Sequence, residues 1–363
     1  MSSDLTKNAV LRAAPKNGCP KDGSVKLLFF IAIFMSYAIP LFAEDNIHAE
    51  LLIAGEWGNK EGEFGIEKNG KTELGFALDF FLVENNIYIL DSINDRVQIF
   101  DIQGNLKEII KLSIKWQEFG LPWNFALLQN NFYMLIGKPP YYNPNGVQEI
   151  FKVSHDGKLI KSFGKEQLSR DKEEYYYRVL SDKAIGYIVC GINGNNIIAF
   201  DGDGSFTHKL MTAKGYPKEI IKLQGITPEG DLIVNRNKLN SKEKRTVIFD
   251  VKKKMIKKEI SGYFSASDRE GNYYRIRSMH IKRGSNAFST RIDIYSTKSN
   301  QLKTFSLPGD IRVAKHNKEK VFHSSGRLYE VSQVDPEGNI YHLMAVEEGV
   351  ILRKIVWKKM VNH

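Results

Sequence analysis

The stretch DSINDRVQIFD, residues 91–101, decides the fold because its ending recurs along the chain. It closes on an aromatic residue and an acid, and aromatic residues return in matching context at spacings of 51, 49, 49 and 46 residues. These positions are Phe100, Phe151, Phe200, Phe249 and Tyr295. Three of the five have an arginine four residues earlier, namely Arg96, Arg245 and Arg291. So regular a period indicates a repeat architecture, in which one structural unit is stacked several times.

Each period is predicted to form four short strands. In the first period, apolar runs at 78–83, 87–90, 96–100 and 106–112 are separated by polar turns. Turns of this kind mark hairpins, because Gly, Asn and Asp tolerate positive φ. Similar turns marked by glycine recur at 155–157, 201–204, 228–230, 269–271 and 336–338. Convincing helical periodicity is absent, so we expect an all-β chain of repeated four-stranded meanders, which is a β-propeller.

Counting the periods predicts six blades. They are placed at about 74–112, 121–163, 176–213, 220–260, 262–307 and 326–357. The last blade has no fourth run of its own, whereas the segment from Ala49 to Trp57 precedes the first blade and has no other partner. We therefore expect this N-terminal strand to complete the sixth blade and close the ring, because closure removes an exposed strand edge.

The first blade resembles an NHL repeat, whose core follows the pattern D-x-x-N-x-R-[IV]-x-[IV]-F-[DN]. The matching residues are Asp91, Asn94, Arg96, Val97, Ile99, Phe100 and Asp101. Blades four and five keep only the arginine and the aromatic residue, and the other blades have drifted further. The resemblance implies a closed six-bladed ring that is used mostly for binding, with a minority of enzymes in the family.

The N-terminal segment predicts export. An apolar run from Leu27 to Ala43 follows Lys26 and precedes an acidic pair, as in a secretory signal with cleavage after Ala43. The alternative is an uncleaved membrane anchor, although the run is short for a spanning helix. Residues 1–43 are thus a signal peptide or anchor, and residues 44–363 form the propeller. We expect a periplasmic or extracellular protein, in contact with the membrane only if the segment stays uncleaved.

Signatures of catalysis and metal binding are weak. After cleavage only Cys190 of the two cysteines would remain, which excludes an intramolecular disulfide and a zinc site built on several cysteines. The histidines show no HxH or HExxH spacing, and no G-x-S-x-G motif is present. We therefore assign no catalytic residue or metal ligand and expect no cofactor. A channel site of the gluconolactonase type would need a Glu, an Asn and an Asp at one point, and the sequence assigns no such trio.

Aromatic residues in the loops suggest a binding face. Loops that join strands two and three, or one blade to the next, lie on the same face of a propeller and vary freely. On this basis we expect six residues to border one concave surface: Trp123, Tyr141, Tyr142, Tyr175, Tyr176 and Arg178. The alternative is that Tyr175 and Tyr176 divide between core and solvent as ordinary strand residues. A structural role is expected for Asp91, Asn94, Arg96, Phe100, Arg245 and Arg291.

The leading functional hypothesis is a non-enzymatic binding propeller with a protein, peptide or glycan partner in the cell envelope. The net charge of +10 is compatible with anionic partners. The alternative is a hydrolase or lyase of the lactonase type with a site in the central channel. Binding of nucleic acid would use the basic charge but conflicts with the signal segment.

Overall fold

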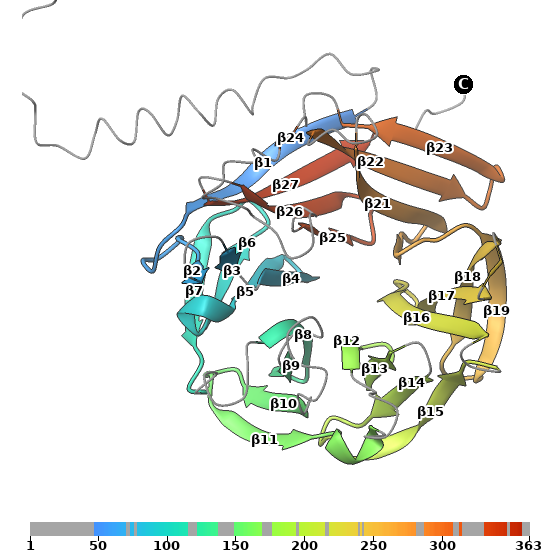
Figure 1. The fold of residues 1–363 in the computed structure, drawn as a ribbon, viewed down its shortest axis with the longest axis horizontal. Helices are drawn as coiled ribbons and strands as arrows, with labels where there is room; N and C mark the ends of the chain where they lie inside the picture. The colour runs from blue at the N-terminus through green and yellow to red at the C-terminus, as the bar shows by residue number, and fades with distance from the viewer. Residues whose placement is uncertain are drawn as a thin grey trace, which may run out of the picture. The chain divides into compact units, whose positions relative to one another are not determined.

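Six antiparallel sheets stand around a common centre in the computed structural model, which makes the fold an all-β, six-bladed β-propeller (Figure 1). The structure describes residues 47–69, 73–75, 78–114, 122–136, 149–168, 176–193, 196–214, 218–238, 240–241, 243–280, 287–307, 312–313, 330–346 and 349–357. All of these residues belong to one compact unit of the chain. The predicted signal or anchor, residues 1–43, lies outside them. In the ranges just given, no helix is long and apolar enough to span a membrane.

The first three blades each contain four strands in sequence order, with the first strand innermost (Figure 1). Blade 1 consists of β4 (Leu78–Val83), β5 (Asn86–Asp91), β6 (Arg96–Asp101) and β7 (Leu106–Lys111). Blade 2 consists of β8 (Pro122–Leu128), β9 (Asn131–Ile136), β10 (Glu149–Ser154) and β11 (Leu159–Phe163). Blade 3 consists of β12 (Tyr176–Ser181), β13 (Ile188–Ile192), β14 (Asn196–Phe200) and β15 (Phe206–Thr212).

The remaining blades continue this order around the ring. Blade 4 consists of β16 (Glu219–Ile226), β17 (Leu232–Lys238), β18 (Lys244–Asp250) and β19 (Met255–Ser261). Blade 5 consists of β20 (Ala266–Ser267), β21 (Asn272–His280), β22 (Ala287–Ser296) and β23 (Gln301–Ser306), with β24 (Arg312–Val313) paired to β22. Blade 6 contains β25 (Glu330–Val334), β26 (Ile340–Val346), β27 (Gly349–Trp357) and β1 (Ile47–Glu56). The short elements are the hairpin of β2 (Glu67–Asn69) and β3 (Glu73–Gly75), and the 3₁₀ turns η1 (Ser92–Asn94) and η2 (Lys165–Gln167).

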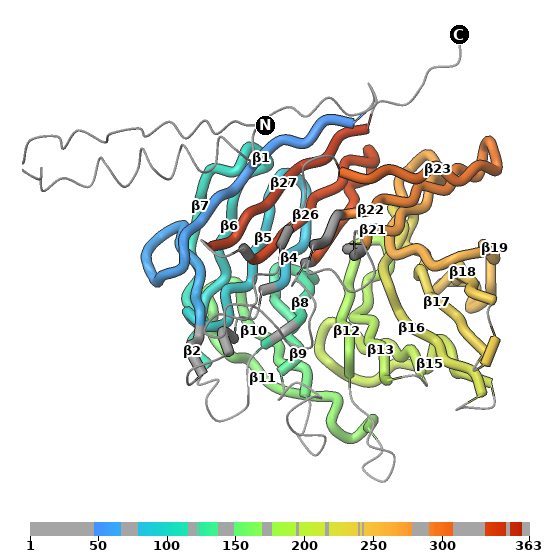
Figure 2. The backbone as a smooth tube through the Cα atoms, turned by 45° about the horizontal axis from the view of Figure 1, so that its top comes forward, coloured from blue at the N-terminus to red at the C-terminus, as the bar shows by residue number. Residues whose placement is uncertain are grey.

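Strand β1 closes the ring, as the sequence predicts. It pairs antiparallel with β27 from Ile47 opposite Trp357 to Glu56 opposite Gly349, and it is the outer strand of blade 6 (Figure 2). The pairing requires glycine at 349, because an added Cβ there would overlap the carbonyl oxygen of Gly55. The first and last strands of the propeller thus share one sheet.

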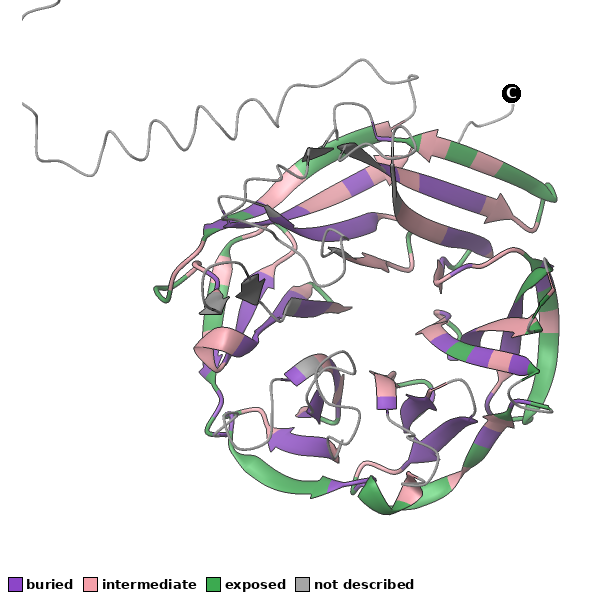
Figure 3. Ribbon diagram, viewed as in Figure 1, coloured by how far each residue is buried: buried purple, intermediate pink, exposed green. Residues whose placement is uncertain are grey.

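Burial changes from the middle of each blade to its outer edge (Figure 3). The central strands β5 and β6 are buried almost throughout, whereas the outer strand β11 is exposed in four of its five residues. A central strand is covered on both faces by neighbouring blades and therefore has a continuous apolar run, as in the sequence IYIL of β5. The outer strands β7 and β19 carry both lysine and glutamate, which oppose the addition of another strand.

The apolar core is divided into six clusters, each of which lies between two neighbouring blades. The cluster between blades 6 and 1 joins Ile53 of β1, Phe100 of β6 and Leu352 of β27, all less than 5% exposed. Phe100, the aromatic residue of the repeat motif, is therefore a core residue at the closure. Every blade depends on both neighbours to bury its faces, so the fold is stable only as a ring.

Deletion of residues 44–58 removes β1 and is expected to lower the free energy of unfolding by about 3 kcal/mol or more, from the lost burial of Ile53 and its neighbours alone. Thermal and urea unfolding measure the effect against a control chain that begins at residue 44. A deleted chain that remains a soluble monomer and melts with the control would contradict the assigned closure.

Candidate functional site

The repeat motif in blade 1 forms a buried ion pair. The Asp91 carboxylate is fully buried, and its Oδ2 accepts a hydrogen bond from Arg96 Nε at 2.8 Å. The other two nitrogens of the guanidinium donate to backbone carbonyls of the loop after β1, at 3.0 Å to Asn59 and 2.6 Å to Glu63. Burial raises the pKa of Asp91, and its hydrogen bonds to Asn94, Gly65 and Arg96 oppose this shift. The ion pair thus attaches the loop that follows β1, which we call the closing segment, to blade 1.

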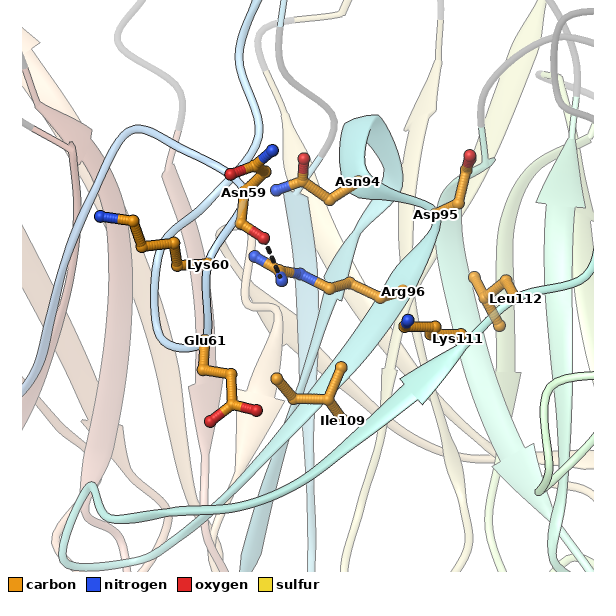
Figure 4. A pocket seen from close by; sticks show the side chains of 9 residues that line it. All are labelled: Asn59, Lys60, Glu61, Asn94, Asp95, Arg96, Ile109, Lys111 and Leu112. Carbon is orange, nitrogen blue, oxygen red and sulfur yellow. Dashed lines mark hydrogen bonds between the residues drawn. The ribbon is translucent and has the colours of Figure 1, made fainter.

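Neighbouring polar side chains add to this attachment. Asn94 Nδ2 donates a hydrogen bond to Gly58 O at 2.8 Å. The side-chain amide of Gln98 donates to Glu63 O and accepts a hydrogen bond from the backbone N–H of Gly62. A pocket of 540 Å³ lies beside these groups (Figure 4). It is lined by Asn59, Lys60, Glu61, Asn94, Asp95, Arg96, Ile109, Lys111 and Leu112. Arg96 extends toward Asn59 in this view, and its donors already serve the loop, so the contacts are structural.

The arginines at the equivalent repeat positions have different environments. The Arg245 side chain is 47% exposed and pairs with Glu243 and Glu259 at the surface. Arg291 is 35% exposed and pairs with Asp293 at 3.0 Å. Only Arg96 is buried, at 7% side-chain exposure. The shared sequence position therefore does not imply a shared role.

Arg96→Ala is expected to lower the free energy of unfolding by about 3–5 kcal/mol, because it leaves the Asp91 carboxylate buried without its cation. Arg245→Ala removes an arginine from the same repeat position at the surface and is expected to change stability little. Urea unfolding of the two variants measures the difference, and equal losses would refute the structural distinction between them.

A second polar cluster lies on the innermost strands of blades 1, 2 and 3. Asp79 of β4 is 7% exposed, and its Oδ2 accepts hydrogen bonds from Asn124 Nδ2 at 2.6 Å and from Phe125 N at 3.2 Å. Asn124 of β8 in turn accepts a hydrogen bond from Val179 N of β12 at 2.6 Å. These side chains join adjacent blades whose innermost strands are not paired through their backbones.

Asp79, Asn124 and Arg178 occupy equivalent positions of three repeats. Asp79 accepts the backbone N–H of Phe125 and Asn124 accepts that of Val179, each donor lying in the next blade. Each of these donors directly follows the equivalent position of its own blade. Arg178 cannot accept a hydrogen bond, so the corresponding N–H of Leu223 is bonded to the hydroxyl of Tyr177. The same position therefore changes from carboxylate to amide to cation around the ring.

β-bulges direct two of these side chains. A register shift lies between Pro122 and Asn124 in β8, and another lies between Tyr176 and Arg178 in β12. The extra residue in each strand breaks the alternation of faces and turns the following side chain. Bulges occur often at sites where a side chain must be aimed.

The electrostatics of the cluster are set by burial. Burial raises the pKa of Asp79 to about 6, against the opposing effects of Arg178, the Phe125 amide and Asn124. Arg178 is partly exposed, and its Nε is buried without a hydrogen-bond partner in the residues that the structure describes. The cluster thus combines a carboxyl whose pKa is about 6 with a partly exposed guanidinium whose buried Nε has no partner among the described residues.

The structure describes two of the six predicted binding-face side chains. Arg178 lies in the polar cluster. Tyr176 is instead fully buried, donates to Gly164 O at 2.6 Å and packs between blades 2 and 3, so it belongs to the core and not to a binding surface. Tyr141, Tyr142 and Tyr175 lie outside the described residues, as does the side chain of Trp123 on β8.

Sequence reasoning missed Asp79 and Asn124. Each is a lone polar residue near the start of an otherwise apolar inner strand, and that is the signal that could have identified them. Their partners lie 45 and 55 residues away in the sequence, so no local pattern connects them. Among the residues described, no group of three or more His, Cys, Asp or Glu side chains is arranged to hold a metal ion.

Comparisons with known proteins show similarity of fold. No family model matches the chain, and no curated protein matches it by sequence. An oligogalacturonate lyase in complex with manganese is 11% identical, with a TM-score of 0.49 over 77% of this chain and 76% of the other. A streptogramin B lyase is 11% identical, with a TM-score of 0.45 over 86% and 98%. The "Putative exported protein" of Bacteroides fragilis is 11% identical, with a TM-score of 0.47 over 88% and 98%. Similarity at this level says nothing about what this chain binds or converts.

Asp79→Asn is expected to alter the pH dependence of stability. A carboxyl whose folded pKa is about 6, against 3.8 for its ordinary value, stabilises the fold below pH 3.8, and this contribution is lost as the pH rises through 6. Asparagine keeps an acceptor oxygen and does not ionise. The free energy of unfolding of the variant relative to wild type should therefore rise by about 3 kcal/mol from acid to neutral pH.

The control for this experiment is Asp156→Asn. Lys158 and Ser154 lower the pKa of the exposed Asp156 carboxyl to about 2, so its substitution should bring no gain at neutral pH. Urea unfolding across this pH range measures both variants. A constant difference between Asp79→Asn and wild type would show that Asp79 does not titrate there.

Proposed function

We propose that this chain is an exported, non-enzymatic binding propeller that presents one face to a protein, peptide or glycan partner. The observation that carries the proposal is Arg178, a partly exposed cation at the start of an innermost strand, beside Asp79 and Asn124. Its buried Nε has no hydrogen-bond partner among the described residues. The starts of first strands and the ends of second strands lie on the same face of a propeller, where loops are free to vary. This position and the partial exposure of the Arg178 side chain support its contact with a partner.

The hydrogen bonds of the cluster favour binding over catalysis. Both polar atoms of the Asn124 amide are engaged, with Asp79 and with Val179 N, and one oxygen of Asp79 accepts two hydrogen bonds. These groups hold the inner strands in place. A metal site of the lactonase type would bring a cation beside Arg178, and the two positive charges would repel each other. The alternative of a hydrolase or lyase is thus less well supported.

The chemistry of Arg178 favours a partner with oxygen acceptors. A guanidinium donates in a planar fork that matches carboxylates, and it also binds carbonyl and hydroxyl oxygens. Lys222, exposed on the innermost strand of blade 4, adds a second cation to the neighbouring part of the ring. Acidic glycans and peptide carboxylates satisfy this arrangement. Trp123, Tyr141, Tyr142 and Tyr175 remain part of the proposal as an aromatic border to the same face.

Two finer assignments belong to the proposal. The motif in residues 91–101 supports membership of the NHL-repeat group of propellers. The apolar run from Leu27 to Ala43 supports export by a signal peptide or an anchor, which would place the partner in the periplasm or outside the cell.

Arg178→Gln is expected to weaken capture of the native partner from envelope extract by about tenfold or more, because a central arginine often dominates an interface. The double variant Tyr141→Ala with Tyr142→Ala should weaken the same capture. Arg245→Gln, which removes the same charge from the outer part of blade 4, is the matched control.

Melting temperatures are measured beside capture, so that loss of fold is distinguished from loss of contact. Reduced capture with unchanged melting in the Arg178 and tyrosine variants supports the proposal. Normal capture by Arg178→Gln, or equal loss in Arg245→Gln, excludes this face as the binding surface.

A further inference from the structure

Three arginines lie together on one face of blade 5. Strands β21 and β22 pair with Arg275 opposite Asp293 and with Arg277 opposite Arg291. Residues directly opposite each other in antiparallel strands lie on the same face of the sheet. Tyr273 continues this face and belongs to the apolar cluster between blades 4 and 5, whereas Tyr274 lies on the other face, toward blade 6. The arginines therefore border the space between blades 4 and 5.

Among the described residues, one carboxylate, that of Asp293, forms ion pairs with arginines of this face. Asp293 pairs with Arg277 Nη2 at 3.1 Å and with Arg291 Nε at 3.0 Å, and it also accepts the hydroxyl of Thr304 at 2.8 Å. Arg275 makes no hydrogen bond or ion pair with another side chain of the described chain, and Arg277 Nε is buried there without a partner. Within the described part of blade 5, these three cations share the single carboxylate of Asp293.

Blade 4 contributes polar residues to the face that lies opposite these arginines. Asn237 of β17 is in register with Lys244 of β18, and the Asn237 Oδ1 atom is buried with no partner in the described residues. The Lys244 ammonium lies 5.4 Å from the ring centre of Tyr263. Burial raises the pKa of Tyr263, and the charge of Arg275 opposes this shift. Asn237 and Lys244 of blade 4 and the arginines of blade 5 thus face the space between the two blades, and we call these residues the interblade polar region.

Among the described residues, the positive charge of the interblade polar region is only partly compensated. The pKa of Arg275 is lowered, first by burial and then by repulsion from Arg277 and Arg291, and the attraction of Asp293 does not offset these effects. Gathering like charges in a partly desolvated space destabilises the fold unless they are paired. The repulsion among these arginines therefore lowers the stability of the isolated protein.

Blade 4 shows how the same propeller balances arginines elsewhere. Arg236 pairs with Glu219 and Glu259, and Arg245 pairs with Glu243 and Glu259. Two cations are matched there by three carboxylates. The excess of arginine in blade 5 is consequently a local feature and not a property of every surface of this basic chain.

We propose that the interblade polar region between blades 4 and 5 binds an oxyanion, a carboxylate, sulfate or phosphate group carried by a ligand. Arg275 and Arg277 hold the group from blade 5, and Lys244 completes its neutralisation from blade 4. Guanidinium forks suit such oxygens because they form paired, charge-assisted hydrogen bonds. The site is separate from Arg178 and does not depend on the function proposed for the polar cluster of Asp79, Asn124 and Arg178.

The test titrates the propeller with inorganic sulfate, inorganic phosphate and glucuronate at low ionic strength by calorimetry. Arg275→Gln and Arg277→Gln are expected to weaken binding by about tenfold each, the effect of one charge-assisted contact. Asp293→Asn removes the competing anion while keeping an acceptor oxygen, so it should strengthen binding. Arg269→Gln removes an exposed arginine paired with Glu337 and serves as the control of equal charge.

The outcomes distinguish a site from a diffuse basic surface. Binding of glucuronate alone assigns a sugar acid or other carboxylate, and tighter binding of sulfate or phosphate assigns a tetrahedral anion. Absence of binding by all three probes, or an equal loss in Arg269→Gln, overturns the proposal. Melting at low salt gives a second readout, because Arg275→Gln should raise the melting temperature by relieving repulsion. A lower melting temperature would show that Arg275 is already paired and would also overturn it.

Discussion

The pairing of β1 with β27 is the interaction on which the rest of the structure depends. Each blade buries its two faces only against its neighbours, and blade 6 obtains its outer strand from the beginning of the propeller. Removal of that strand would expose the cluster between blades 6 and 1 and leave an unpaired edge. The Arg96–Asp91 pair reinforces the same junction, because its guanidinium binds the carbonyls of the segment that leaves β1. Apolar and polar contacts thus converge where the ring is closed.

A closed ring fixes the innermost strands without backbone pairing between them, so side chains must make the connections. Asp79 and Asn124 do so by accepting amides of the next blade. At the third equivalent position the chain has Arg178, and the Tyr177 hydroxyl takes over the structural bond to Leu223. Arg178 is therefore not needed as an acceptor between the inner strands. This separation of roles at equivalent positions supports the proposal that Arg178 contacts a partner.

The architecture could be predicted from the sequence because its determinants are local. Alternating apolar runs and turns such as the one at Gly104, whose φ is +89°, fix the strands and their order. The residues of the candidate site were harder to predict. The bulge between Tyr176 and Arg178 sends Tyr176 into the core, and no periodic pattern reveals a bulge. Arg96 and Arg245 share a repeat position, yet one is buried and the other exposed, since only blade 1 meets the closing segment.

The distribution of charge links the ring to its proposed functions. A flexible surface would relieve the repulsion among Arg275, Arg277 and Arg291 by moving the side chains apart. Here two of them are held by Asp293 on paired strands, and the apolar cluster that includes Tyr273 fixes the blade beneath them. At the proposed anion site, such rigidity would keep the donors oriented before a ligand binds and would lower the entropy lost on binding. The free energy that closure provides is therefore what allows the propeller to sustain an unbalanced charge between two of its blades.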